Sequence, residues 1–178
     1  MPTARRSRTI AAPVEDLWAL IGDPHHLPRW WPRVTRVEDV TFTDSGESDA
    51  FTEVMRTRKG KLVRADFDVT ARDEDEHTLT WSQRVEGTPF AQVLSSAETQ
   101  LWLTTAGSNG ATVNTGQAEG RGMRTEVTIE LRQSMVRYSN RSRGMFLGLA
   151  PRLGGTMVRR AALATLDEAL DGLERVSG

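Results

Sequence analysis

Apolar and polar residues alternate along most of the middle of the chain. This period of two predicts antiparallel β-strands that bury one face and leave the other in water. The clearest example is 62–71, where Val63, Ala65 and Phe67 alternate with charged residues. Similar alternation predicts further strands over 34–42, 51–58, 78–85, 97–105 and 124–133.

Between an expected N-terminal strand and the first of these strands, the pattern changes to helical spacing. Val14, Leu17 and Ile21 recur at intervals of three and four residues, which indicates the apolar face of a short helix. Gly22 can end this helix, and Asp23, followed by a proline, can cap the first turn of a second one. We therefore expect two short helices directly after the first strand.

The C-terminal part of the chain predicts one long helix over about 156–176. Leu166, Leu170 and Leu173 lie on one face of that helix. The chain has 178 residues, and no internal repeat or linker interrupts it. A single domain over 1–178 is therefore expected.

This order of elements favours an α+β fold. Hairpin-linked strands flanked by helices form a curved antiparallel sheet of about seven strands, and the C-terminal helix is the one long element able to cover its apolar face. The sheet should therefore wrap around that helix. Small residues on the facing surfaces, namely Ala65, Ala161 and Ala164, favour an internal cavity between sheet and helix.

One combination of motifs is specific enough to suggest a family. Ile10–Trp18 reads IAAPVEDLW, and it is followed by Asp23-Pro24, Leu27-Pro28, Trp30-Trp31-Pro32 and the terminal helix. In these residues and in the order of elements, nearly the whole chain resembles the SRPBCC superfamily, the START-like or helix-grip fold, and within it bacterial proteins of the polyketide cyclase/dehydrase kind. The resemblance implies an apolar ligand held between the sheet and the long helix.

Three functions stay open on these grounds. The chain is expected to bind a hydrophobic or amphipathic small molecule, lipid-like or polyketide-like, in the cavity. The resemblance also permits a polyketide aromatase/cyclase-type enzyme that shapes a reactive chain in the same cavity. A third possibility is an accessory protein that docks through an arginine-rich surface. The residues expected to line the cavity, with Gln83 orienting the ligand, are Phe67, Leu79, Trp81, Gln83, Val127, Ile129, Met157 and Ala161.

Charge and composition bear on the class of partner and on the expected location of the protein. The net charge of −1 gives no indication of nucleic-acid binding. Cysteine is absent, no apolar run reaches the roughly 20 residues of a membrane span, and the N-terminus lacks a signal-peptide core, so we expect a cytoplasmic protein. Bases without acids fill 131–166, and the Arg132–Arg160 region offers a site for peripheral membrane contact or an anionic partner. Acids without bases fill 37–55, where a solvated surface is the simpler interpretation.

No motif establishes catalytic chemistry. Neither a Ser-His-Asp order nor a phosphate-binding glycine loop is present, and no cofactor is expected. His25 and His26 have only His77 as a further histidine, so no metal site is expected. Asp66 and Asp68 fall on the face opposite Phe67, which disfavours a carboxylate pair in the cavity.

For several other residues and segments, the sequence leaves open whether their role is structural or functional. Glu53 is a catalytic candidate if its strand turns it inward. Of Trp30 and Trp31, one should anchor the short helices, and the other lies at the surface or stacks on a ligand. Tyr138 is either a hydrogen-bond donor at the pocket or an interfacial aromatic. The loop 106–123 and the connector 134–155 are long enough to lie near a cavity mouth.

Overall fold

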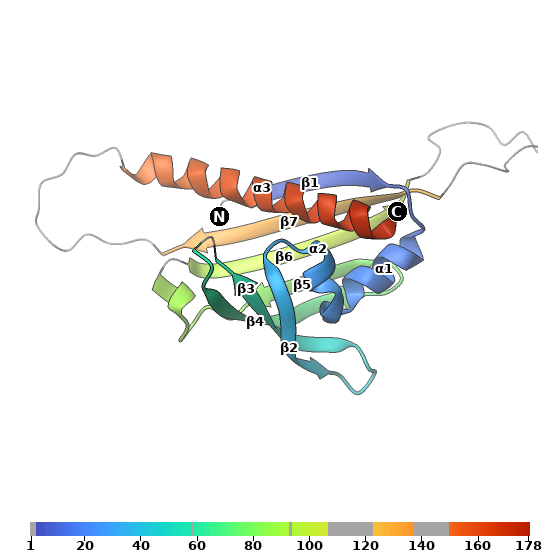
Figure 1. Ribbon diagram of the computed structural model, residues 1–178, viewed down its shortest axis with the longest axis horizontal. Helices are drawn as coiled ribbons and strands as arrows, with labels where there is room; N and C mark the ends of the chain where they lie inside the picture. The colour runs from blue at the N-terminus through green and yellow to red at the C-terminus, as the bar shows by residue number, and fades with distance from the viewer. Residues whose placement is uncertain (1–2, 58, 93, 107–122, 137–149) are drawn as a thin grey trace, which may run out of the picture.

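The chain forms one curved antiparallel sheet with a long helix across its concave face (Figure 1). The computed structural model describes residues 3–57, 59–92, 94–106, 123–136 and 150–178, with side chains of the last segment described at 156 and from 158 onward. The elements in chain order are β1 Thr3–Ile10, α1 Val14–Gly22, the 3₁₀ helix η1 Pro24–His26, α2 Leu27–Trp30, β2 Val34–Phe42, β3 Ser48–Arg56, β4 Leu62–Asp73, β5 Thr78–Gln83, the 3₁₀ helix η2 Pro89–Gln92, β6 Leu94–Thr105, β7 Thr125–Met135 and α3 Ala150–Ser177.

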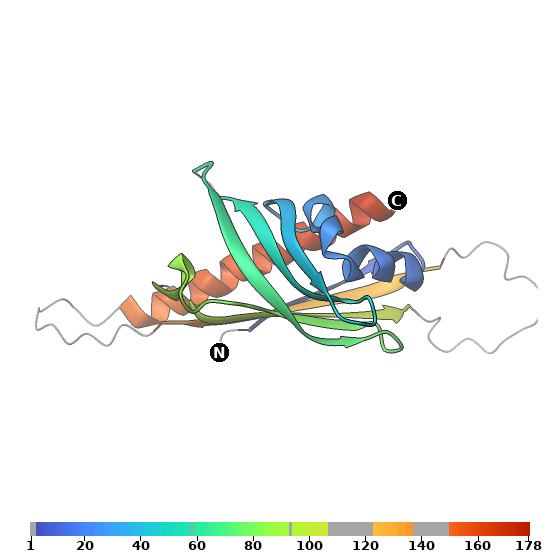
Figure 2. The same ribbon diagram turned by 90° about the horizontal axis from the view of Figure 1, so that it is seen from below.

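The sheet has seven strands in the order β1-β7-β6-β5-β4-β3-β2, and every neighbouring pair is antiparallel. Only β1 departs from simple hairpin order, because it pairs with the last strand, β7. Figure 2 shows β2, β3 and β4 bending toward the side of the sheet on which α3 lies. The predicted helix-grip α+β fold is therefore confirmed, and three short helical segments, α1, η1 and α2, follow β1, with η1 and α2 contiguous where one second helix was predicted.

Of the N-terminal helical segments, η1 begins at a side-chain cap. The Asp23 side chain accepts a hydrogen bond from the backbone N–H of His25 at 2.9 Å, and this begins η1. Pro24 stands at the first position of that turn, where its missing N–H costs nothing. At the other end of the chain, α3 starts at Ala150 instead of the predicted 156, because Pro151 lies in the first helical turn, where proline is tolerated.

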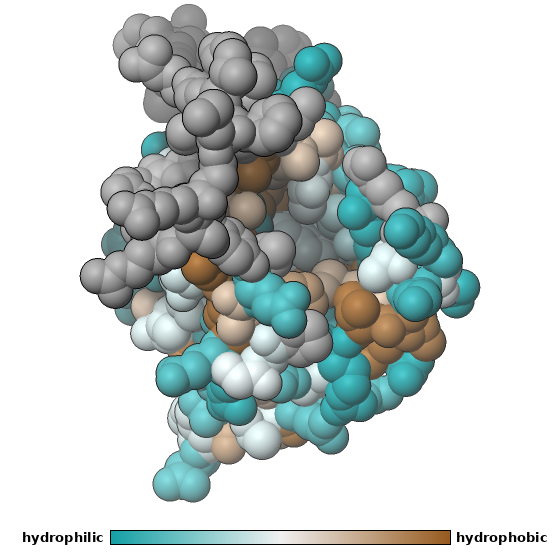
Figure 3. All heavy atoms as spheres, turned by 90° about the vertical axis from the view of Figure 1, so that its left-hand side faces the viewer, coloured by the Kyte–Doolittle hydropathy of each residue, from teal (hydrophilic) through white to brown (hydrophobic). Residues whose placement is uncertain are grey.

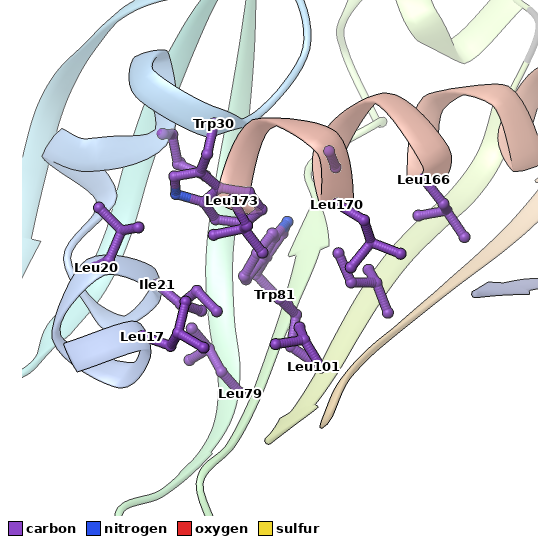
Figure 4. Close-up of a cluster of buried hydrophobic side chains, with 14 of the residues drawn as sticks. Leu17, Leu20, Ile21, Trp30, Leu79, Trp81, Leu101, Leu166, Leu170 and Leu173 are labelled. Carbon is purple, nitrogen blue, oxygen red and sulfur yellow. The ribbon is translucent and has the colours of Figure 1, made fainter. Parts of the chain in front are cut away.

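The C-terminal half of α3 fills one end of the molecule with leucine. Leu166, Leu170 and Leu173 are at most 1% exposed and pack against Trp81 and the strands beneath (Figure 4). Burying each of these side chains contributes about 1.5–3 kcal/mol. Figure 4 also shows Trp30 of α2 beside Leu173, so the short helices close this end of the core.

One glycine lets α2 and α3 approach this closely. A Cβ at position 172 would overlap the backbone carbonyl oxygen of Trp30 and would lie 2.9 Å from its carbonyl carbon. Both atoms belong to backbone that a side-chain rotation cannot move. Gly172 is therefore required by packing, although glycine disfavours a helix interior.

Replacing this glycine should destabilise the fold even though alanine is the better helix former. We expect Gly172→Ala to lower the free energy of unfolding by about 2–3 kcal/mol, because α2 must move away from α3. Chemical denaturation measures the loss. Glu168→Ala, an exposed change on the same helix, is the control and should stay within about 0.5 kcal/mol; equal stability of Gly172→Ala and the native chain would contradict the packing argument.

Candidate functional site

A cavity of about 400 Å³ lies between the sheet and the first half of α3. It occupies the end of the molecule at which β7 ends and α3 begins. Seen from that end, the surface is hollowed and apolar residues are visible within the hollow (Figure 3). Its walls come from β3 to β7, from η2, from α3 and from Trp31. A cavity of this size matches the ordinary range for small-molecule sites.

The composition of α3 explains why the space is left open here. Where the helix crosses the cavity it presents Val158, Ala161, Ala162 and Thr165, and the leucine face begins only at Leu166. Short side chains cannot reach the sheet across the gap that leucines span elsewhere. The cavity is therefore the continuation of the core beyond the leucine segment.

Four of the eight predicted lining residues border this cavity, namely Phe67, Trp81, Gln83 and Ala161. Of the three alanines expected to create the space, only Ala161 lines it. Ala65 is buried outside the cavity wall and Ala164 is exposed on α3. Ala162 and Ala97 contribute small side chains instead.

The predicted placement of Leu79, Val127 and Ile129 at the cavity is corrected by the structure. All three point to the concave face, as their alternation indicated, but they lie at the closed end of the core. Val127 and Ile129 are fully buried, and Leu79 borders only a separate void of about 10 Å³. The same face of β7 reaches the cavity further along the strand, at Leu131, Gln133 and Met135.

The prediction placed Leu79, Val127 and Ile129 at the cavity because periodicity gives the face of a residue but not its position along the strand. On β5, Leu79 is in the closed core, whereas Trp81 lines the cavity. On β6, Leu101 is in the core and Thr99 lines the cavity. The predicted Met157 lies outside the described side chains, as do Tyr138 and most of the loop and connector expected near the mouth.

The two neighbouring tryptophans divide between the two roles left open above. Trp30 is 2% exposed and anchors α2 in the core. Trp31 lines the cavity, with its ring perpendicular to that of Trp30 at 5.3 Å between centroids and edge-on to Trp81 at 5.9 Å. An aromatic corner with two rings is thus available to a ligand.

Glu53 is the most unusual residue of the site. It is 1% exposed, it lines the cavity, and its Oε1 atom has no hydrogen-bond partner. Its neighbours across the sheet are Val37 on β2 and Ala65 on β4, and neither carries a charge. Burial raises the pKa of Glu53 from its ordinary 4.5 to about 8, so the carboxyl is neutral at pH 7.

The sequence placed this residue in an acidic run interpreted as solvated surface, and for Glu53 that interpretation is wrong. The sequence signal that points to it is alternation, because Glu53 lies two residues from both Phe51 and Met55 and so shares their face of β3. Asp66 and Asp68 behave as expected on the opposite face. Asp66 accepts a hydrogen bond from Thr52 at 2.7 Å, and Asp68 accepts one from Arg84 at 2.7 Å.

Gln83 carries the second unpartnered atom of the cavity. Its Nε2 is buried and donates to no atom of the described chain. Gln83 is paired across the sheet with Phe67, whose ring stacks on Phe51 at 5.3 Å. An amide held against aromatic walls is able to orient a polar group of a ligand.

Other features of the described residues bear on metal binding, on membrane insertion and on the basic region. Within the described residues, no group of three or more His, Cys, Asp or Glu side chains could hold a metal ion, and no helix is long and apolar enough to cross a membrane. Arg132, at one end of the predicted basic region, forms ion pairs with Glu130 at 2.6 Å and Glu98 at 3.2 Å. Arg159 and Arg160 are exposed on α3.

Comparison with known proteins agrees with this architecture. Residues 1–178 match the family described as polyketide cyclase / dehydrase and lipid transport. The chain therefore belongs to this family, as a polyketide-cyclase-like member of the SRPBCC superfamily. A search of curated proteins finds no match.

Solved structures show the same fold at low identity. A START superfamily protein from Mycobacterium smegmatis has a TM-score of 0.66 and 14% identity, with 98% of this chain and 96% of that chain covered. The ZhuI aromatase/cyclase from a Streptomyces species gives 0.64 and 14%, covering 98% and 92%. The di-domain aromatase/cyclase BexL gives 0.67 and 14%, covering 98% of this chain and 46% of its own.

The raised pKa of Glu53 predicts how stability changes with pH. Between pH 4.5 and 8 the folded state holds a proton that the unfolded state has released, so the free energy of unfolding falls as pH rises through this window. Across this window, the titration of Glu53 lowers the free energy of unfolding by an amount on the order of 5 kcal/mol. Glu53→Gln removes the titrating group without changing its shape and should flatten this part of the profile.

Thermal unfolding followed from about pH 5 to pH 8.5 measures the difference between the two chains. Glu126→Gln, which removes an exposed carboxylate from β7, is the matched control and should retain the native pH dependence. Parallel profiles for the native chain and Glu53→Gln would show that Glu53 is ionised in the folded state at neutral pH.

Proposed function

We propose that this protein binds a hydrophobic or amphipathic small molecule, lipid-like or polyketide-like, in the cavity between the sheet and α3. The cavity itself is the observation that carries the proposal. Most of its lining is apolar or aromatic, and few polar side chains interrupt it. Moving an apolar ligand from water onto such a lining is favourable by about 25 cal/mol for each Å² of apolar surface that becomes buried.

The shape of the lining supports a binding role further. Trp31, Trp81 and Phe90 provide flat rings, and Met55 and Met135 provide flexible thioether side chains that adapt to different outlines. Met135 is 42% exposed at the rim, so an apolar surface continues from the interior to solvent.

Narrowing the mouth of the cavity should weaken ligand binding without affecting the fold. Ala161 lines the cavity yet is exposed, so Ala161→Phe adds a ring at the mouth without overpacking the core. With the neutral fluorophore Nile red as probe, we expect the native chain to bind and to enhance its emission. The affinity of Ala161→Phe should be lower by about tenfold or more.

Ala164→Phe is the matched control, because Ala164 is exposed on the same helix and does not line the cavity. It should bind Nile red as the native chain does. Equal binding by all three proteins would place the probe elsewhere and would contradict a ligand site in the cavity.

A second candidate is an aromatase/cyclase-type enzyme acting on a ligand held in the same cavity, and Glu53 is the observation that favours it. A carboxyl kept neutral at pH 7 inside an apolar cavity is suited to act as a general acid. Two of the similar structures are of aromatase/cyclases. Cyclisation of a poly-ketone chain would then depend on Glu53 for proton transfer, whereas binding of the chain would not.

Product analysis separates the two functions. The native chain and Glu53→Gln are each co-produced with an enzyme system that releases a linear poly-ketone, and the cyclised products are compared. For an enzyme, we expect Glu53→Gln to reduce product formation by about 100-fold or more while Nile red still binds. Identical products with both proteins would show that Glu53 takes no part in cyclisation and would remove the observation that favours this second function.

A further inference from the structure

The cavity contains two buried polar atoms that lack partners within the described chain, Glu53 Oε1 and Gln83 Nε2. Unpartnered buried atoms are costly, at about 1–3 kcal/mol each, and a native structure rarely keeps two of them in one place without a use. Glu53 stands on β3 and Gln83 on β5, with β4 between them. Both side chains line the concave face, so one bound molecule can contact both.

The surroundings of Glu53 decide the form in which it meets a ligand. On β2 and β4 it faces Val37 and Ala65, and the part of α3 that lines the cavity contributes Val158, Ala161, Ala162 and Thr165. Among the described lining residues, Glu53 is the only titratable group, and no arginine, lysine or histidine joins it there. An ionised carboxylate would have no counter-charge, which agrees with the pKa of about 8 that burial produces.

In its protonated form, Glu53 offers an O–H donor, and Gln83 offers an N–H donor. A ligand that satisfies both must present acceptors. Carbonyl oxygens do so without carrying a charge into the cavity, and an aliphatic or aromatic frame fits the remaining walls. An ammonium group has no lone pair with which to accept from either donor, and it would bind only if Glu53 ionised and the Gln83 amide turned its Oε1 acceptor toward the cavity.

We propose that Glu53 and Gln83 form a pair of hydrogen-bond donors that selects neutral, carbonyl-bearing ligands, with the bound state requiring the proton on Glu53. This inference rests on the proposed binding function and specifies the chemistry of the same site. Ligand binding is then linked to pH. Affinity for a ketone is constant at low pH and falls as Glu53 ionises, because the donor becomes an acceptor that repels the carbonyl oxygen.

Three probes of similar size test the pair: acetylnaphthalene carries the ketone, ethylnaphthalene has no acceptor, and naphthylethylamine carries a cation. Their affinities are measured by calorimetry at about pH 6 and about pH 9. For the native chain at the lower pH, we expect acetylnaphthalene to bind about tenfold more tightly than ethylnaphthalene. At the higher pH, this preference should disappear.

Variants assign the effect to the two residues. Glu53→Gln keeps an N–H donor and no titration, so the ketone preference should persist at both pH values. Glu53→Leu and Gln83→Leu each remove a donor and should reduce the preference to about threefold or less at the lower pH. If Glu53→Leu does not fold, Glu53→Gln and Gln83→Leu still decide the matter.

Each outcome has a distinct meaning. Equal affinity for acetylnaphthalene and ethylnaphthalene in the native chain would overturn the donor pair while leaving the apolar cavity in place as a binding site. Tighter binding of naphthylethylamine than of the ketone would assign Glu53 to a cationic ligand and would also overturn the proposal. Failure of all three probes, together with Nile red, would instead contradict the proposed binding function itself.

Discussion

The structure depends on how one helix covers a concave sheet that is longer than the apolar face of that helix. α3 crosses the whole sheet, but its leucines fill only the C-terminal half of the interface. That half, with Trp30 and the short helices, holds the fold together. The other half has alanine, valine and threonine facing the sheet, and there the same architecture leaves a cavity of about 400 Å³. The dense packing that stabilises the fold and the open cavity thus lie at different parts of one helix.

This division explains why a carboxyl can be buried in the sheet. In the leucine half, a buried glutamate would disrupt dense packing and leave an unpaired group among hydrocarbon. Beside the cavity, Glu53 loses its solvation, but its oxygen faces space that a ligand can enter. Burying Glu53 therefore lowers the stability of the fold, and destabilising groups of this kind are common where a protein binds or transforms a molecule. Gln83 is likewise buried beside the cavity without a partner for its Nε2, and burying a neutral amide costs less free energy than burying an ionisable carboxyl.

The sequence predicted the fold nearly completely, since periodicity, capping residues and the Trp-Trp-Pro segment all indicate the same order of elements. It predicted the site only in part. Phe67, Trp81, Gln83 and Ala161 border the cavity because alternation gives the inward face of a strand or helix, and their contact with a ligand stays a prediction. Leu79, Val127 and Ile129 face inward as well, yet they lie at the filled end, since position along the strand depends on where α3 places its leucines. Glu53 was left open because a single strand pattern, rich in acids, does not fix its register against β2 and β4.

The pairing of β1 with β7 has a consequence for how the chain folds. Thr3 lies opposite Arg132 and Ile10 opposite Thr125, so the first strand waits for residues more than a hundred positions later. Contacts this distant in sequence are formed slowly, because a long loop must be closed before any of them is gained. During synthesis, β2 to β6 can assemble as successive hairpins, while β1 stays without its partner until β7 has left the ribosome. The apolar concave face is uncovered for the same period, since α3 is made last, and this interval is when the chain is most exposed to aggregation.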